Sequence, residues 1–170
     1  GGFTVPSKDP EAGLRVLQAL IDKRGRDVKL GLDVAASTFF KDGKYLVGDK
    51  VMDTDSLLSF YKLLVINYQL VSIEDPFAEE DWEGFEKITK DLGSQTWIVG
   101  DDLTTTNPAR IKLAHEKNAV NTVIIKPNQI GSVSETLKAT SLAKSYGWKI
   151  IVSHRSGETM DSFIADLAVG

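Results

Sequence analysis

The chain has 170 residues, of which 42% are hydrophobic and 26% charged, and this length and composition are typical of a single soluble domain with its own core. The formal net charge of −4 comes with scattered basic residues, so we expect no binding to nucleic acid or to anionic membranes. With no cysteine, no apolar run near the ~20 residues of a membrane span and no secretion signal, the sequence argues against disulfides, thiolate metal sites and membrane insertion.

The first predicted elements are a helix, a strand, a hairpin and a second helix. We expect the first helix over residues 9–24, because Pro10 suits a first helical turn and leucines recur on one face. A strand follows at 28–33. Apolar pairs on both sides of Asp42-Gly43 predict a hairpin, and the second helix is expected over 55–68.

After residue 69, predicted strands and helices alternate. The strands are expected over residues 70–75, 97–102, 122–126 and 149–153, and the helices over 81–93, 107–118, 132–147 and from near Glu158 onward. Asn107-Pro108 is typical of a helix start, and Ser132 with Glu135 forms a capping box. Because the strands are continuously apolar, they indicate a parallel sheet covered on both sides. An open doubly wound sheet and part of a (β/α)8 barrel both fit this order.

All five predicted core strands end on a charged or titratable residue: Asp33, Glu74, Asp101, Lys126 and His154. In a parallel barrel these ends share one rim, where active sites are built. A single charged strand end needs no function, because the chain leaves the core there, but five in succession favour a site. Three converging carboxylates repel one another unless a cation lies between them, and a ligand set of oxygens alone suits Mg2+.

The fourth and fifth strand ends add the remaining chemistry. A lysine beside a divalent metal is disfavoured in its protonated form, which prepares Lys126 as a base. Arg155 offers a planar fork of donors for a phosphate or carboxylate, and Ser156 adds a hydroxyl. The pattern therefore indicates a metal that neutralises a bound acid while Lys126 removes the adjacent proton. Other polar residues are expected to serve turns or the surface only: Asp75, Asp102 and His115.

Five segments resemble the enolase family, in the family's order: GLDVAAS (31–37), SIEDPFAEEDW (72–82), GDDLTTTNP (100–108), IIKPNQIGS (124–132) and SHRSGETMDSFIADLAVG (153–170). Together they span most of the chain. The resemblance implies an α/β fold, an incomplete (β/α)8 TIM-type barrel of the enolase superfamily with about five parallel strand–helix units. Residues 1–170 would then be part of the C-terminal catalytic barrel domain.

The resemblance also implies an activity, the Mg2+-dependent dehydration of 2-phosphoglycerate to phosphoenolpyruvate in glycolysis and gluconeogenesis. Enolase-superfamily sites are known to use a lysine or histidine base with Mg2+ ions. Carried over, the ligands of the high-affinity Mg2+ are Asp33, Glu74 and Asp101. Lys126 is the base that takes the proton from carbon 2 and contacts the substrate, and His154 is an active-site residue beside it. Arg155 and Ser156 bind the substrate phosphate and a second metal ion.

Enolases contain further parts that we do not find in this sequence. The opening GGF matches the loop after a general-acid glutamate, which would precede Gly1, and the family also has an N-terminal domain and a later substrate-binding lysine. We therefore expect the isolated chain to bind Mg2+ weakly and to turn over slowly or not at all. The intact enzyme is expected to be a cytoplasmic homodimer. Two alternatives stay open: a non-catalytic fragment or scaffold that self-associates through open sheet edges, and a superfamily member acting on a non-phosphorylated acid.

Overall fold

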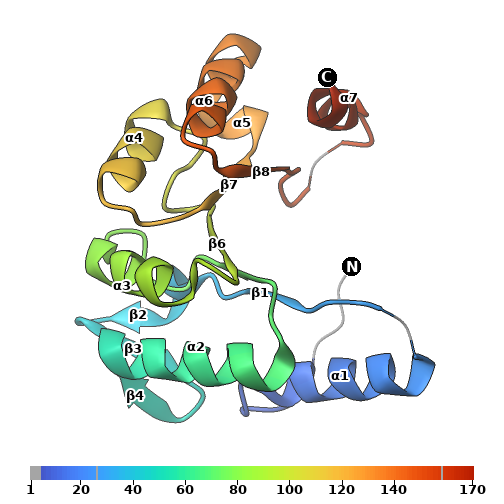
Figure 1. Cartoon of the computed structure of the whole chain (residues 1–170), viewed down its shortest axis with the longest axis vertical. Helices are drawn as coiled ribbons and strands as arrows, with labels where there is room; N and C mark the ends of the chain where they lie inside the picture. The colour runs from blue at the N-terminus through green and yellow to red at the C-terminus, as the bar shows by residue number, and fades with distance from the viewer. Residues whose placement is uncertain (1–4, 26, 158) are drawn as a thin grey trace.

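The chain is seen in a computed structural model, which describes residues 5–25, 27–157 and 159–170. Its main feature is a five-stranded parallel sheet in the order β1-β5-β6-β7-β8 (Figure 1). These strands are Gly31–Asp33, Ser72–Glu74, Trp97–Gly100, Thr122–Ile125 and Lys149–Val152. Within the described residues the sheet stays open, with β1 and β8 at its two edges. The structure thus confirms the predicted α/β class and the incomplete barrel of five parallel strands.

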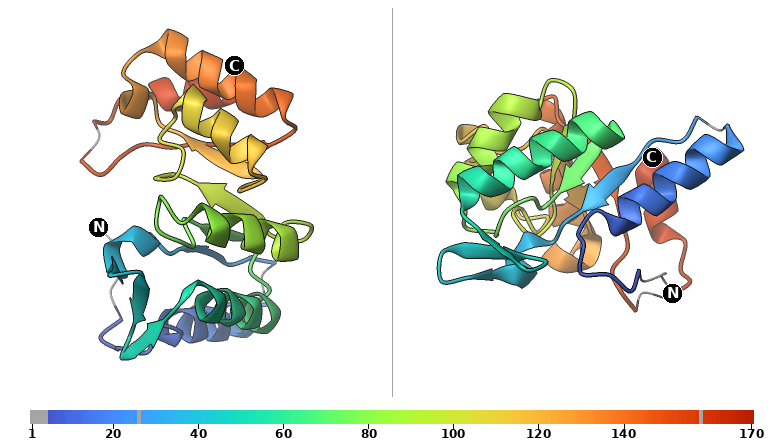
Figure 2. Two further views of the ribbon diagram at one scale, coloured as in Figure 1. Left: turned by 90° about the vertical axis from the view of Figure 1, so that its left-hand side faces the viewer. Right: turned by 90° about the horizontal axis from the view of Figure 1, so that it is seen from below.

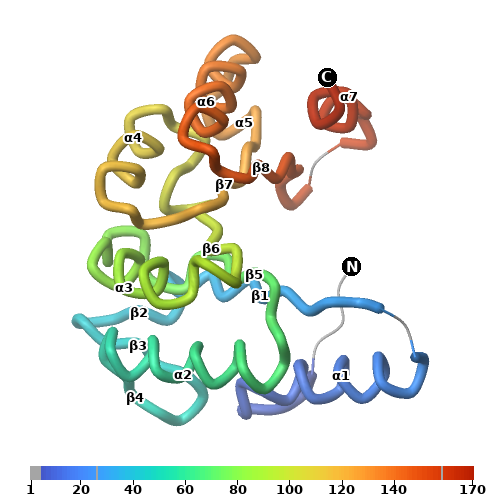
Figure 3. Tube along the Cα trace, viewed as in Figure 1, coloured from blue at the N-terminus to red at the C-terminus, as the bar shows by residue number. Residues whose placement is uncertain are grey.

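Helices connect successive strands and form an arc along one side of the sheet (Figure 1). Four of them lie in the connections from β1 to β5, β5 to β6, β6 to β7 and β7 to β8: α2 (Thr54–Tyr68), α3 (Trp82–Leu92), α4 (Pro108–Glu116) and α6 (Val133–Ser145). Helix α1 (Ala12–Arg24) precedes β1, and α7 (Phe163–Val169) follows β8, as the tube in Figure 3 allows the reader to trace. Among the described residues, no helix combines the length and apolar character that crossing a membrane requires.

Side-chain caps explain where the helices begin. Asn107 accepts a hydrogen bond from the amide of Ala109 at 2.9 Å and so caps α4, as predicted. Ser132 caps α6 by accepting from the amide of Glu135 at 3.3 Å, and its hydroxyl donates to the Glu135 carboxylate at 2.6 Å. The predicted Ser132 cap is therefore confirmed, whereas Glu135 contacts the Ser132 hydroxyl in place of the backbone amide that a capping box uses.

The predicted hairpin is present and belongs to a small antiparallel sheet beside α2 (Figure 2). This sheet consists of β2 (Phe40–Lys41), β3 (Lys44–Val47) and β4 (Lys50–Met52), and a short 3-10 helix (Ala36–Phe39) precedes it. Asp42 and Gly43 have φ of 51° and 76°, which is the backbone that a two-residue hairpin turn needs. The third strand, β4, was not predicted.

Two helix starts differ clearly from the sequence-based expectation, and one helix is additional. Helix α1 begins at Ala12 rather than at residue 9, and Glu11 before it makes no side-chain cap. A short helix, α5 (Pro127–Ile130), follows β7 directly and was not predicted. Helix α7 begins only at Phe163, whereas the start expected near Glu158 lies outside the described residues.

The core between the sheet and α2 and α3 is built around the buried ring of Phe77. Tyr45, Tyr61 and Phe85 surround it edge to face, with ring centroids 5.9, 5.7 and 6.0 Å away. Such contacts add to the free energy gained from burying the rings. Because Phe77 lies three residues after Glu74, this packing anchors the loop that leaves the end of β5.

His115, expected at the surface, is partly exposed and also packs against two aromatic side chains. Its ring stacks on Tyr146 with centroids 3.6 Å apart and an interplanar angle of 8°, and it meets Trp148 edge-on at 5.9 Å. These aromatic partners come from the far end of α6 and the turn before β8. These partners lie about one strand–helix unit away in the sequence and are not visible in the local pattern.

Candidate active site

The charged strand ends meet along one rim of the sheet. Asp33 and Glu74 are the last residues of β1 and β5 and are paired directly in the parallel ladder. Asp101 and Lys126 directly follow β6 and β7. Parallel strands with their carboxyl ends on one side bring these four residues, far apart in the sequence, to neighbouring positions.

An ion pair joins β7 to β6. The Nζ of Lys126 donates to Oδ2 of Asp101, and both side chains are largely buried, with exposed fractions of 15% and 10%. The other carboxylate oxygen, Oδ1, accepts from Nε2 of Gln129 at 3.0 Å. Hydrogen bonds to a charged group are shorter and stronger than neutral ones, so Asp101 is held from two directions.

Three carboxylates lie together at this rim. Oxygens of Glu74, Asp75 and Asp101 are all within 4.8 Å of one another. Burial, followed by the charges of Asp33 and Asp101, raises the pKa of Glu74 to about 7. Burial also raises the pKa of Asp75 to about 7. Near neutral pH the three carboxylates therefore lack a positive charge to balance them. Their oxygen donors suit a hard divalent cation.

Asp75 and Asp33 differ in how they take part in this cluster. Asp75 is only 4% exposed, and its two oxygens accept the backbone amides of Asp101 at 3.1 Å and Asp102 at 2.8 Å. Asp75 therefore does bind a turn, as expected, but this turn follows the neighbouring strand β6, and Asp75 also belongs to the carboxylate cluster, which was not expected. Asp33 is not in the 4.8 Å group, but its pKa is raised by partial burial and also by the charge of Asp101.

Residues predicted to handle the substrate share one cavity beside the ion pair. Its volume is about 470 Å3, and its lining residues are Lys126, Asn128, His154, Arg155 and Ser156. The lysine and asparagine come from the end of β7 and from α5, and the other three from the loop after β8. The predicted base and the predicted phosphate-binding residues therefore lie around one space.

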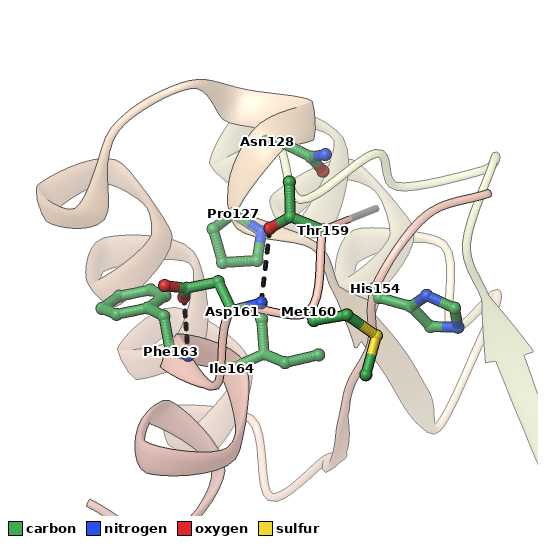
Figure 4. A pocket seen from close by; sticks show the side chains of 8 residues that line it. All are labelled: Pro127, Asn128, His154, Thr159, Met160, Asp161, Phe163 and Ile164. Atoms are coloured by element: carbon green, nitrogen blue, oxygen red, sulfur yellow. Dashed lines mark hydrogen bonds between the residues drawn. The ribbon is translucent and has the colours of Figure 1, made fainter. Parts of the chain in front are cut away.

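A neighbouring cavity of about 400 Å3 shares Asn128 and His154 with the first (Figure 4). Its other lining residues are mostly apolar or belong to the turn before α7: Pro127, Thr159, Met160, Asp161, Phe163 and Ile164. His154 thus lies on the border between a polar cavity that contains Lys126 and an apolar one. This position agrees with a residue that forms part of the wall of a site.

Two uncharged residues of the site were not found from the sequence, Thr106 and Gln129. The hydroxyl of Thr106 accepts from the amide of Lys126 at 2.9 Å and donates to Oε1 of Gln129 at 2.6 Å. The run of three threonines in the loop after β6, at residues 104–106, was the available signal, because buried polar side chains need hydrogen-bonding partners. A search for charged residues at strand ends does not find these threonines, because they carry no charge.

Known proteins match this chain over nearly its whole length. The family model described as "Enolase, C-terminal TIM barrel domain" matches residues 1–170. Curated relatives named enolase include those of Pyrococcus furiosus, Thermococcus gammatolerans and Thermococcus kodakarensis, which are 51%, 49% and 50% identical over 99% of this chain. The chain spans 41% of the length of each of these relatives. By this match, the chain belongs to the enolase family and corresponds to its C-terminal TIM barrel domain.

Proposed function

We propose that this chain supplies the metal site and the catalytic base of an enolase, which dehydrates 2-phosphoglycerate to phosphoenolpyruvate in glycolysis and gluconeogenesis. The observation that carries the proposal is the pairing of the Lys126 amine with Asp101, beside Glu74. An amine next to a carboxylate cluster, at the mouth of a polar cavity, is the arrangement that proton removal next to a carboxylate requires.

The donor set fits Mg2+, because it consists of carboxylate oxygens that lack enough positive charge among themselves. Glu74 and Asp101 are the first two proposed ligands. We propose Asp33 as the third rather than Asp75, because Asp33 is paired with Glu74 at the strand ends, whereas Asp75 accepts the two backbone amides that shape the loop after β6. When bound, Mg2+ supplies positive charge opposite the substrate carboxylate and lowers the cost of removing the neighbouring proton.

The chain's own residues then have separate roles in the reaction. Arg155 and Ser156 bind the phosphate in the cavity that they share with Lys126, and His154 forms the wall. The Nζ of Lys126 takes the proton from carbon 2, so that the C–H bond breaks and its electron pair forms the double bond to carbon 3. The hydroxyl on carbon 3 leaves as water after protonation by a separate acid.

The base assignment can be tested by one partial reaction. Exchange of the carbon-2 hydrogen of 2-phosphoglycerate with deuterium oxide needs the base and the metal but not the acid, and NMR follows it directly. We expect slow, Mg2+-dependent exchange with the chain and none with Lys126→Met, while Lys112→Met on the exposed side of α4 retains it. Equal exchange by Lys126→Met, or no exchange by a chain that binds the metal, would overturn the assignment.

The remaining expectations concern the full reaction and the intact enzyme. Dehydration by the isolated chain is expected to be very slow or absent, and ultraviolet absorbance of phosphoenolpyruvate measures it. We propose that the intact enzyme is a cytoplasmic homodimer whose partner in the reaction is a small molecule rather than nucleic acid or membrane.

A second candidate function is a non-catalytic fragment or scaffold that self-associates. Two observations favour it: the described sheet has open edges at β1 and β8, and large apolar side chains are exposed, with Ile66 at 72% and Val51 at 70%. Size-exclusion chromatography with light scattering tests it. Self-association should weaken in Ile66→Lys, and a monomer at high concentration would contradict it.

A further inference from the structure

Strained backbone is concentrated at the rim that carries the candidate site. Outside glycine, four residues that closely follow ends of β1, β5 and β6 have positive φ: Ala35, Asp75, Thr105 and Thr106. The two threonines are consecutive, at 47° and 55°, and β-branched residues rarely adopt this conformation. Such a conformation persists only where surrounding contacts hold it, and it is found most often at functional sites.

Two hydrogen bonds fix the orientation of the Thr106 hydroxyl. The side chain is fully buried, at 0% exposure. The amide of Lys126 can only donate, so the Thr106 oxygen accepts from it at 2.9 Å, and the hydroxyl proton goes to Oε1 of Gln129 at 2.6 Å. With its oxygen so engaged, Gln129 turns its Nε2 toward Oδ1 of Asp101 at 3.0 Å. We call this pair of side chains the Thr106–Gln129 relay.

The relay begins and ends on the two residues of the ion pair. It links the backbone amide of Lys126 to one oxygen of Asp101, while the Lys126 amine contacts the other oxygen. The contacts therefore close a ring through Lys126, Thr106, Gln129 and Asp101. A closed ring fixes both the rotation of the Asp101 carboxylate and the position of Lys126 along β7, which neither contact does alone.

We propose that Thr106 and Gln129 are positioning residues of this site, which orient the Asp101 carboxylate toward a bound cation and hold Lys126 beside it. Their importance for turnover rests on the proposed function, but the relay is a property of the metal-free chain. Hydrogen-bonding partners of a ligating carboxylate typically change metal affinity by about 10- to 100-fold. The same contacts account for the strained loop, because this backbone places the Thr106 hydroxyl between the Lys126 amide and Gln129.

Matched threonine variants separate the hydroxyl from the strain and the packing. Thr106→Val keeps the β-branched shape and removes the hydroxyl, whereas Thr106→Ser keeps the hydroxyl and removes a methyl group. Thr105→Val makes the same change at the adjacent residue with positive φ, whose hydroxyl is not part of the relay. Gln129→Met breaks the relay from α5 and leaves the Thr106 loop untouched, so it serves if Thr106→Val does not fold.

Three readouts apply, and the first two need neither metal nor turnover. In Thr106→Val, NMR hydrogen exchange at the Lys126 amide should become about tenfold faster, the effect of losing one hydrogen bond. The Gln129 side-chain amide resonance should move toward its random-coil position in the same variant. Electron paramagnetic resonance of Mn2+ should show affinity reduced by about 10-fold or more in Thr106→Val and Gln129→Met. Thr106→Ser and Thr105→Val should resemble the unchanged chain in all three.

Each other result contradicts the inference. Unchanged Lys126 exchange and Gln129 resonance in Thr106→Val would show that the relay does not exist. Equal losses in Thr105→Val, or in Thr106→Ser, would assign the effect to backbone or methyl packing. A relay confirmed by NMR with unchanged Mn2+ affinity in the variants would show that it does not position Asp101. If the unchanged chain binds no Mn2+, the proposed metal site fails, and the two NMR readouts still decide the relay.

Discussion

Lys126 and Asp101 are 25 positions apart in the sequence, yet they form an ion pair between the adjacent ends of β7 and β6. Breaking a buried pair by removing one partner leaves an uncompensated charge, which costs about 3–5 kcal/mol. We therefore expect Lys126→Met to lower the melting temperature of the metal-free chain, by about 2–4 °C for each kcal/mol. Lys126→Met combined with Asp101→Asn should recover most of the loss, and Lys112→Met should change little. An unchanged melting temperature in Lys126→Met would show that the pair is weak in solution.

The acidic rim predicts two pH effects on the free energy of unfolding. The stability of the metal-free chain should fall as the pH rises, whereas the stabilisation that a metal adds should grow. The pKa of Glu74 is raised from its ordinary value of 4.5 to about 7, so the folded chain keeps a proton that the unfolded chain has lost. Its contribution to stability is full below about pH 4.5 and is lost as the pH rises through about 7. The shift at Asp75 acts in the same direction.

Denaturant unfolding at pH 5 and pH 8 checks this dependence. The metal-free chain should lose stability between the two values, and Glu74→Gln should lose less. Saturating Mg2+ should stabilise more at pH 8 than at pH 5, because protons and the cation compete for the same oxygens. A metal-free chain that gains stability toward pH 8 would contradict the crowding of carboxylates at the rim.

Removing a proposed ligand should weaken metal binding far more than removing an exposed carboxylate elsewhere. We expect Asp33→Asn, Glu74→Gln and Asp101→Asn each to lower Mn2+ affinity by more than the ~10-fold typical of residues that only hydrogen-bond a ligand. Asp27→Asn, at a largely exposed site before β1, is the matched control. Unchanged Mn2+ affinity in Asp33→Asn would indicate that Asp75, and not Asp33, is the third ligand.

The loop after β5 depends on a buried tyrosine. The hydroxyl of Tyr45 donates to Asp81 at 2.6 Å and accepts from the amide of Ala78 at 3.0 Å. Tyr45→Phe leaves that amide without its acceptor, so we expect a loss of about 1–3 kcal/mol in the free energy of unfolding. Tyr68→Phe removes a hydroxyl bonded to Glu11 near the surface and should cost less than ~0.5 kcal/mol. Equal effects of the two variants in denaturant unfolding would contradict this account.

Much of the fold could be predicted because its signals are local. The caps at Asn107 and Ser132, the Asp42-Gly43 turn and the continuously apolar strands each predict an element from a few neighbouring residues. The charged strand ends could also be predicted to share a rim, because parallel topology alone brings them there.

What could not be predicted depends on contacts between distant segments. Thr106 and Gln129 carry no charge, and their roles appear only when the loop after β6 meets α5. Asp75 serves amides on the next strand rather than its own turn. His115 stacks on an aromatic ring from the end of α6. In each case the partner lies 20 or more positions away, beyond the reach of a local pattern.

The central claim is that three acidic strand ends and one lysine surround a shared divalent cation. Anomalous diffraction from crystals of the chain soaked in Mn2+ tests it most directly. We predict one strong peak bounded by the carboxylates of Asp33, Glu74 and Asp101, on the side of the rim that faces Lys126. A peak away from these residues, or none at saturating Mn2+, would contradict the account.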